Sequence, residues 1–154
     1  MAQAIIVHHV DMNLRPAPIN PDWVIDGSPT ARNLELSRSP DGLARTVLWD
    51  CTPGRFQWIY DIDETIHILE GSVMLDDGVA GPRRYGPGDV VFFPAGAIVQ
   101  WTVEIHVRKL AFFRRGLPAP IAKLTGAMQH LKAAMRIGAS STRTRQRKGR
   151  RAAA

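Results

Sequence analysis

The sequence contains a single cysteine, Cys51, and therefore cannot form an intramolecular disulfide bond. No window of the 154-residue chain approaches the roughly 20 apolar residues that a membrane-spanning helix needs. The N-terminal segment, MAQAIIVHHVDMN, has no basic region and only a short apolar run, which is not the pattern of a secretory signal peptide. These absences lead us to expect a cytoplasmic protein that does not interact with a membrane.

Acidic residues are missing from the C-terminal tail, GASSTRTRQRKGRRAAA, residues 138–154. Of the 20 Lys and Arg residues in the chain, six lie in this tail, and the other 14 balance the 14 Asp and Glu. A segment of this composition cannot build a core, so we expect it to be disordered. It could increase solubility, or it could be an RNA- or membrane-binding arm. We favour the first and do not expect nucleic-acid binding, because no aromatic residue lies among the cations of residues 143–151 to stack on bases.

Glycine and proline are frequent, with 13 and 11 residues, and they separate short apolar runs. The hydrophobic content of 45% is enough for one domain with a sizeable core. Several short strands with turns at this spacing are typical of an antiparallel sandwich or barrel. The runs that predict strands are 4–10, 44–50, 55–60, 64–70, 72–77, 89–94, 98–104 and 106–114.

Different patterns flank this strand-rich region. The segment that follows the first predicted strand is rich in Pro and Asn, and we expect it to be an ordered surface arm anchored by Trp23, Val24 and Ile25. Residues 117–137 carry apolar side chains near helical spacing and predict an amphipathic C-terminal helix.

The stretch YGPGDVVFFPAG, residues 85–96, places a Gly-Asp turn before a strand that ends in Pro-x-Gly. Gly88 can form the turn, and Asp89 can accept backbone N–H bonds within it. This pattern resembles the second motif of the cupin superfamily, in which Gly, five residues, Pro, one residue and Gly precede a metal-binding His and a later Asn. Here Val99 and Val103 occupy the positions of that His and that Asn.

The first cupin motif has two His residues separated by one residue, then Glu three or four residues later, and then Gly after six more residues. Glu64 and Gly71 match its second half, but Trp58 and Tyr60 occupy the His positions. Three of the four ligand positions, counting Val99, therefore hold side chains that do not normally bind a metal. One carboxylate does not supply the converging N and O donors that a divalent ion needs. We therefore expect no metal and no cofactor.

Taken together, VLWDCTPGRFQWIYDIDETIHILEGSV and YGPGDVVFFPAG are similar to the (S)-ureidoglycine aminohydrolase-type cupin domain family, over residues 20–115. The resemblance implies an all-β, RmlC-like jelly-roll barrel with a short C-terminal α-helix. For a true ureidoglycine aminohydrolase it would also imply a manganese site, but only Glu64 falls on a ligand position, where that enzyme is expected to have His. Gln100 is one residue away from another metal-ligand position, the one held here by Val99. The expected organisation is an N-terminal strand and arm, 1–19; the cupin domain, 20–116; the helix, 117–137; and the tail, 138–154.

Strand alternation places Glu64 on the same face as Ile66 and Ile68, and the resemblance to the cupin motif implies that this face lines the interior of the barrel. A carboxylate there must be hydrogen-bonded, paired or protonated. Glu64 could be structural, or it could bind a ligand or act as a general acid or base. We leave both interpretations open at this point. The structural interpretation gives it a hydrogen bond to Tyr60 or Gln100, or a salt bridge to Arg55 or Arg108.

The aromatic residues could be plain core or the wall of a pocket; we favour the pocket for Trp58 and Tyr60, and the core for Trp101. The sequence thus predicts a metal-free homodimer, paired through the apolar strand 4–10, that binds a small organic molecule in its barrel. One alternative is an enzyme acting on an amide, ureido or sugar-like substrate with Glu64 as acid or base. Another is a non-catalytic interaction protein with a filled barrel. The candidate site residues are Trp58, Tyr60, Glu64, Gln100 and Trp101, with Glu64 as the candidate catalytic residue.

Overall fold

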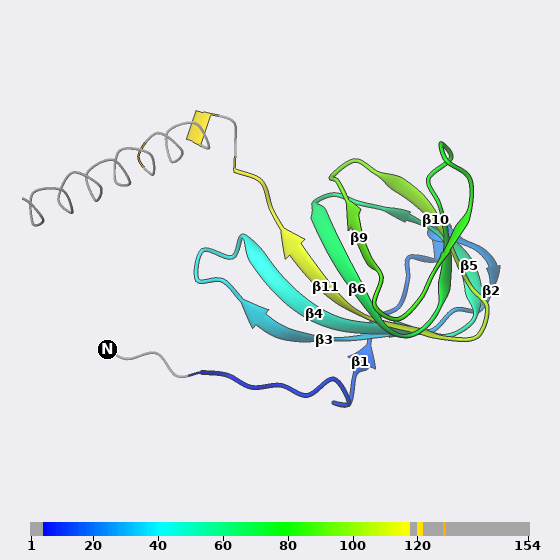
Figure 1. Ribbon diagram of the computed structural model, residues 1–154, viewed down its shortest axis with the longest axis horizontal. Helices are drawn as coiled ribbons and strands as arrows, with labels where there is room; N and C mark the ends of the chain where they lie inside the picture. Colours follow the sequence, from blue (N-terminus) through cyan, green and yellow to red (C-terminus); the bar gives the residue numbers. More distant parts are fainter. Residues whose placement is uncertain (1–4, 118–119, 122–127, 129–154) are drawn as a thin grey trace, which may run out of the picture. The chain divides into compact units, whose positions relative to one another are not determined.

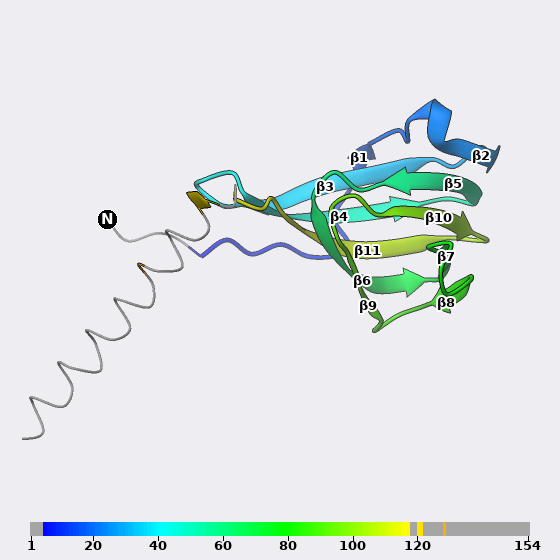
Figure 2. The ribbon, with the colours of Figure 1, turned by 90° about the horizontal axis from the view of Figure 1, so that it is seen from above.

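The computed structural model describes residues 5–117, 120–121 and 128, and every strand in it lies in the unit that ends at Gly116. The fold is all-β and consists of two antiparallel sheets (Figures 1 and 2). The six-stranded sheet has the order β1 (Arg15–Pro16), β3 (Ala31–Arg38), β4 (Ala44–Cys51), β11 (Val107–Arg114), β6 (Asp63–Gly71) and β9 (Val90–Phe93). The five-stranded sheet has the order β2 (Val24–Gly27), β5 (Gly54–Ile59), β10 (Ile98–Val103), β7 (Val73–Asp76) and β8 (Arg83–Tyr85).

The core lies between the sheets because alternate side chains of each strand point inward. In β6, Glu64, Ile66 and Ile68 are buried while the intervening side chains are partly exposed, as strand alternation predicted. In β10, Val99, Trp101 and Val103 alternate in the same way. The inner faces of the two sheets therefore share one hydrophobic cluster, which includes Trp49, Phe56, Ile66, Phe93 and Trp101.

The turns before and after β9 have the conformation expected for YGPGDVVFFPAG. Gly88 and Gly96 have φ angles of 93° and 89°, a region that favours glycine. The Asp89 carboxylate accepts a hydrogen bond from the Gly86 N–H at 2.8 Å. Gly71, the last glycine of the other motif, has a φ of 68°, and a Cβ there would lie 1.9 Å from the carbonyl oxygen of His106. Glycine is therefore required at the start of the β6–β7 connection.

The barrel predicted from the resemblance is not closed, because the two sheets form separate hydrogen-bonded sets. Residues 15–33, where the sequence indicated a surface arm, contribute β1, β2 and the start of β3. Of the expected anchors, Trp23 and Val24 pack against the core, but Ile25 is exposed and Ile19 is buried instead. The arm prediction failed because Pro and Gly around these short runs hid their pairing with β4 and β5.

The two ends of the chain add little to this picture. Residues 5–13 belong to no strand, in contrast to the strand expected over residues 4–10. The structure does not show the helix predicted for residues 117–137, most of which lie outside the described residues, as does the tail 138–154. In the part of the chain that is described, no helix has the length and apolar character needed to cross a membrane.

Candidate ligand-binding site

A cavity of about 330 Å³ lies between the two sheets. Its lining comes from the inner faces of β4, β6 and β11, from β5 and the loop after it, and from the segment that precedes β2. Most of the lining surface is apolar, as is typical of sites for small organic molecules. The aromatic wall consists of Trp23, Trp49, Trp58, Tyr60 and Phe113.

Two charged side chains, Glu64 and Lys109, also line this cavity and form an ion pair. The Lys109 ammonium donates a hydrogen bond to Oε1 of Glu64 at 2.6 Å. The Glu64 and Lys109 side chains are only 2% and 7% exposed, so the pair has little contact with bulk water. Among the described residues, Lys109 is the only hydrogen-bonding partner of this carboxylate, so its second oxygen has no protein donor.

Lys109 reaches Glu64 along the sheet. In the register of β11 with β6, Lys109 lies opposite Ile68, and Phe113 lies opposite Glu64. The pair formed by Ala111 and Ile66 lies between these positions, and the small Ala111 side chain leaves room for the lysine stem. The ammonium also lies 4.9 Å and 4.7 Å from the ring centroids of Trp49 and Trp101, within cation–π range.

Tyr60 adds a polar group to the interior besides the Glu64–Lys109 ion pair. Its hydroxyl oxygen accepts a hydrogen bond from Nε1 of Trp101 at 3.2 Å, and its ring stacks on Phe93 with centroids 4.4 Å apart. Burial, and to a smaller extent the negative charge of Glu64, hold the pKa of Tyr60 well above its usual value. Tyr60 therefore presents a neutral phenol next to the ion pair at physiological pH.

The structure brings together only some of the site residues predicted from the sequence. Trp58, Tyr60 and Glu64 line the cavity. Trp101 is almost fully buried behind it, where it contacts Lys109 and Tyr60 without lining the cavity, consistent with a core role. Gln100 does not belong to the site: it follows Val99 and precedes Trp101, both buried, so it points to the opposite face of β10.

The partner of Glu64 was missed. The partner that bonds to the Glu64 carboxylate is Lys109. The sequence had instead suggested Tyr60, Gln100, Arg55 or Arg108. Arg108 points the other way, to the outer face of β11. The missed signal lies in VRKLA, where strand alternation places Lys109 on the same face as the apolar Val107 and Ala111.

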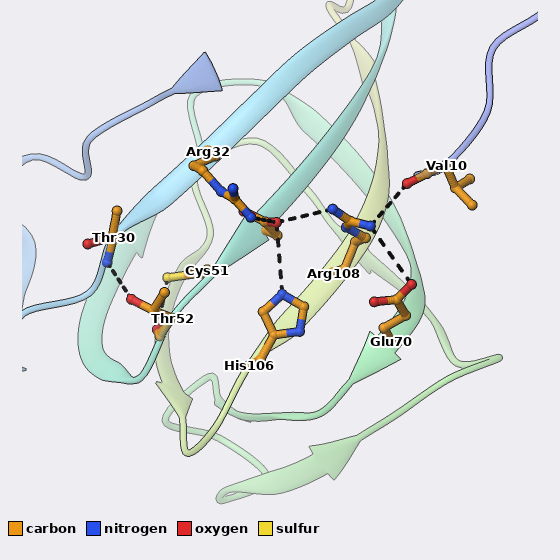
Figure 3. A network of polar contacts seen from close by, with 9 residues as sticks. Val10, Thr30, Arg32, Cys51, Thr52, Glu70, His106 and Arg108 are labelled. Carbon is orange, nitrogen blue, oxygen red and sulfur yellow. Dashed lines mark hydrogen bonds and ion pairs between the residues drawn. The ribbon is translucent and has the colours of Figure 1, made fainter. Parts of the chain in front are cut away.

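A second polar cluster surrounds Asp50 on the outer face of the six-stranded sheet. Its members Arg32, His106 and Arg108 point toward one another in Figure 3. The Asp50 side chain is 3% exposed and pairs with Arg32 at 2.6 Å, Arg108 at 3.4 Å and His106 at 3.9 Å. Arg108 also donates to the carbonyl oxygen of Val10 at 3.2 Å, which ties the N-terminal segment to β11. Asp50 and its partners do not line the aromatic cavity, and we interpret this network of protein groups as structural.

Cys51 lies in the core, and its thiol donates to the carbonyl oxygen of Thr52 at 3.3 Å. Burial, with a smaller contribution from Asp50, raises the pKa of this thiol to about 12. A nucleophilic cysteine needs a lowered pKa and an adjacent base. The environment of Cys51 is the opposite, so we assign it a structural role.

The residues at the cupin metal positions do not fit a metal ion. Trp58, Tyr60 and Val99 are apolar or aromatic, and Val99 is buried in the core. The remaining carboxylate, Glu64, is held by an ammonium that would repel a cation. Within the described residues, no three His, Cys, Asp or Glu side chains gather as a metal site requires.

Comparison with known proteins identifies the fold. A family model described as the EutQ-like cupin domain matches residues 38–111, the segment that contains β4, β5, β6 and the first part of β11 with most of the cavity wall. The segment therefore has a cupin fold. No curated protein matches the chain. The narrower resemblance to ureidoglycine aminohydrolase-type proteins therefore stays a prediction.

Solved structures agree with the cupin assignment. A DUF861-family protein of unknown function from Pseudomonas syringae is 28% identical, with a TM-score of 0.63, over 68% of this chain and 46% of that one. This chain thus spans less than half of that relative. The polyketide cyclase RemF from Streptomyces resistomycificus is 21% identical, with a TM-score of 0.54, over 75% of this chain and 82% of that one. A putative ethanolamine utilization protein, EutQ, from Salmonella typhimurium is 20% identical, with a TM-score of 0.51, over 68% and 96%.

Proposed function

We propose that this cupin-domain protein binds a small, largely planar organic molecule in the cavity between its sheets, and that it does so without a metal. The observation that carries the proposal is the Glu64–Lys109 ion pair in the wall of an aromatic cavity of about 330 Å³. Cavities of this size and apolar character are typical of small-molecule sites, in which a few polar groups fix the orientation of the ligand.

The ion pair indicates function because it is a costly way to fill a core. Replacing a buried ion pair by apolar residues of similar volume is often neutral or stabilising by about 1–4 kcal/mol. The neighbouring inward positions of β6, Ile66 and Ile68, show that aliphatic side chains fit this face of the sheet. Glu64 and Lys109 therefore serve a ligand in our proposal, with the carboxylate accepting an N–H or O–H group and the ammonium donating to an adjacent oxygen.

This pairing favours a particular chemistry. A ligand that contacts both members of the pair carries a donor next to an acceptor, as an amide, ureido group or hydroxyketone does. The aromatic wall of Trp23, Trp49 and Trp58 complements a flat apolar body. The cavity also argues against the alternative of an interaction protein whose interior is filled by its own side chains.

Tryptophan fluorescence can test the proposal, because three of the four tryptophans, Trp23, Trp49 and Trp58, line the cavity. We expect indole-3-carboxamide and related aromatic amides to change the emission saturably. Glu64→Gln should weaken binding by about tenfold, since it removes the charge that accepts the ligand donor. Glu104→Gln is the matched control, because it makes the same chemical change at an exposed carboxylate paired with Arg84.

Two results would contradict the proposal. One is the absence of a saturable response from any compound of the amide panel. The other is equal binding by wild type and Glu64→Gln, which would leave Glu64 as a structural anchor. Either result would also remove the basis for assigning the cavity to a ligand of this chemistry.

A second function is favoured by the convergence of Tyr60, Glu64 and Lys109. In this case the protein is an enzyme acting on a small amide or ureido substrate, and Glu64 exchanges a proton with it through the oxygen that Lys109 does not hold. The same compounds test this function: release of ammonia from amides or ureides by wild type, but not by Glu64→Gln, would establish an enzyme.

A further inference from the structure

A smaller polar cavity of about 170 Å³ adjoins the aromatic one. The two cavities have four lining residues in common: Arg45, Asp61, Ile62 and Phe113. These shared residues place the two cavities next to each other. The smaller cavity adds Arg38 and Arg115 to the wall, so three of its lining residues are arginines and one is a carboxylate.

The arginines of this smaller cavity differ in their partners. Arg38 is held by Glu35 through two hydrogen bonds, of 2.9 Å and 2.5 Å. In contrast, neither Arg45 nor Arg115 has a carboxylate within 4.0 Å in the described part of the chain. Asp61 lines both cavities and reduces the net positive charge without pairing with them. Arg45 and Arg115 are thus the two cations with free capacity for an anion.

Arg45 has a fixed place relative to the ion pair. Arg45 lies opposite Phe113 in the pairing of β4 with β11, and Phe113 lies opposite Glu64 in the pairing of β11 with β6. Directly paired residues point to the same face of a sheet, so these three side chains form one row. Strands are spaced by about 4.8 Å, which separates the backbone positions of Arg45 and Glu64 by about 10 Å. The Arg45 guanidinium lies over the Phe113 ring, 4.5 Å from its centroid.

From this row we infer that the ligand of the aromatic cavity is an organic acid, whose carboxylate is bound by Arg45 and Arg115 while its other end meets Glu64 and Lys109. The inference rests on the proposed function and adds the chemical class of the ligand. A guanidinium binds a carboxylate through two parallel N–H donors, and its face can stack on an aromatic ring at the same time. The Phe113 ring holds Arg45 at the boundary between the cavities, where both interactions can occur.

Lys109 is the competing site for the carboxylate, and the geometry disfavours it. Its ammonium already donates to Glu64 at 2.6 Å, so an anion brought to it would also approach a buried carboxylate. Like charges placed close together in a poorly hydrated interior repel strongly. The anionic end is therefore expected at Arg45, and the hydrogen-bonding neutral end at Glu64.

Indole-3-propionate and indole-3-propionamide are suitable probes, since they share a ring, a chain length and an N–H donor and differ in charge. We expect wild type to bind the acid about tenfold more tightly than the amide. Arg45→Gln should abolish most of this preference, Arg115→Gln should reduce it, and Arg45→Lys should retain part of it. Added salt should weaken binding of the acid and not of the amide. Arg83→Gln, on the edge strand β8 away from both cavities, is the control for a change in net charge.

The outcomes separate this inference from the proposed function. If acid and amide bind wild type equally, and Glu64→Gln weakens both, the cavity binds ligands and the carboxylate subsite is wrong. If Arg45→Gln and Arg115→Gln both keep the preference for the acid, the anion is held elsewhere and the inference fails. If Arg45→Gln weakens acid and amide alike, Arg45 is only structural. If neither probe binds, the proposed function and the inference fall together.

Discussion

Lys109 and Glu64 make a 2.6 Å bond although they lie four register positions apart along β6. The bond is possible because Ala111 lies between them and a long lysine stem can pass over it. The ammonium is placed between two indole rings, Trp49 and Trp101, and a carboxylate. Leu and Met at these two positions would fill the core equally well. We therefore propose that the buried ion pair serves ligand binding and not stability.

A double-mutant cycle separates these two roles. We expect Lys109→Met to destabilise the fold by about 3 kcal/mol, because it leaves the Glu64 carboxylate buried without its partner. The double variant Glu64→Leu, Lys109→Met should recover most of that loss, since it removes both charges and keeps the volume. Urea unfolding gives the free energies. A double variant as unstable as the sum of its single variants would show that each residue has an independent structural role.

The inner strands could be predicted from the sequence, whereas the partner of Glu64 was missed although alternation in VRKLA pointed to it. The runs at 44–50, 55–60 and 64–70 became β4, β5 and β6, because each alternates or is continuously apolar between turn residues. Alternation placed Glu64 on one face with Ile66 and Ile68, and the cupin motif implied that this face points inward. Lys109 was overlooked because the adjacent cation Arg108 was considered in its place, and a β-bulge between the two shifts the register of β11 against β6.

The edge strands show the other limit. The edge strands β1 and β2 lie in the segment that was expected to be an arm, since their hydrogen bonds depend on distant partners in β3 and β5 and not on a local pattern. Closure of the barrel was expected from the family resemblance alone, and the separate sheets show that this detail does not transfer. Gln100 illustrates the same point, because its position relative to a motif suggested a site and its place in β10 turns it away.

The Asp50 cluster gives a prediction about stability. Asp50→Ala should destabilise the protein by about 2–3 kcal/mol, because it removes a nearly buried carboxylate and leaves Arg108 without its ion-pair partner on β4. The Arg32–Asp50 pair contributes less to this loss, because the Arg32 side chain is 48% exposed and solvent screens its charge. Glu35→Ala, which breaks the exposed pair with Arg38, is the control and should cost less than about 1 kcal/mol. Equal effects in thermal or urea unfolding would contradict the structural role of Asp50.

The buried thiol predicts loss of stability at alkaline pH. The pKa of Cys51 is about 12 in the folded protein, whereas a cysteine in the unfolded chain has a pKa of about 8.5. Above pH 8.5 the unfolded state therefore binds fewer protons, and stability falls as the pH rises toward 12. The expected loss from this group is roughly 2 kcal/mol between pH 8.5 and 10.

Cys51→Ala provides the comparison for this effect. The variant should be less stable at pH 7, because it leaves a small void, but its stability should fall less steeply between pH 8 and 10. This window avoids most of the loss of stability caused by Tyr60. That loss begins near pH 10, where a tyrosine in the unfolded chain ionises while the buried Tyr60 stays protonated. Parallel pH profiles for wild type and variant would show that the thiol ionises equally in both states.

Metal content is predicted from the donors at the cupin ligand positions. We expect purified protein to contain no stoichiometric transition metal, because Trp58, Tyr60 and Val99 replace three ligands and Lys109 holds the fourth position, Glu64. Elemental analysis after purification without chelators measures this. About one Mn, Fe, Ni or Zn per chain, lost in Glu64→Ala, would overturn the prediction and make the metal-free proposal untenable.

The N-terminal segment predicts self-association. Ile5, Ile6 and Val7 are 92%, 74% and 73% exposed, although each is strongly apolar. On the outer face of the six-stranded sheet, Phe92 and Phe112 are also exposed and lie on either side of Thr65. Apolar surface of this kind is usually covered by a partner, and an unpaired apolar segment is suited to adding to a sheet of a neighbouring subunit.

We therefore expect a homodimer that depends on this segment. Deletion of residues 1–10, or replacement of Ile5, Ile6 and Val7 by serine, should shift the protein toward monomer, because it removes apolar area that would be buried between subunits. Sedimentation at tens of micromolar distinguishes the two states. Replacing the exposed Val79 by serine is the control, since it lies in the loop between β7 and β8 and should leave the dimer intact. Wild-type protein that sediments as a monomer would contradict the expectation, and a dimer that survives both changes would place its interface elsewhere.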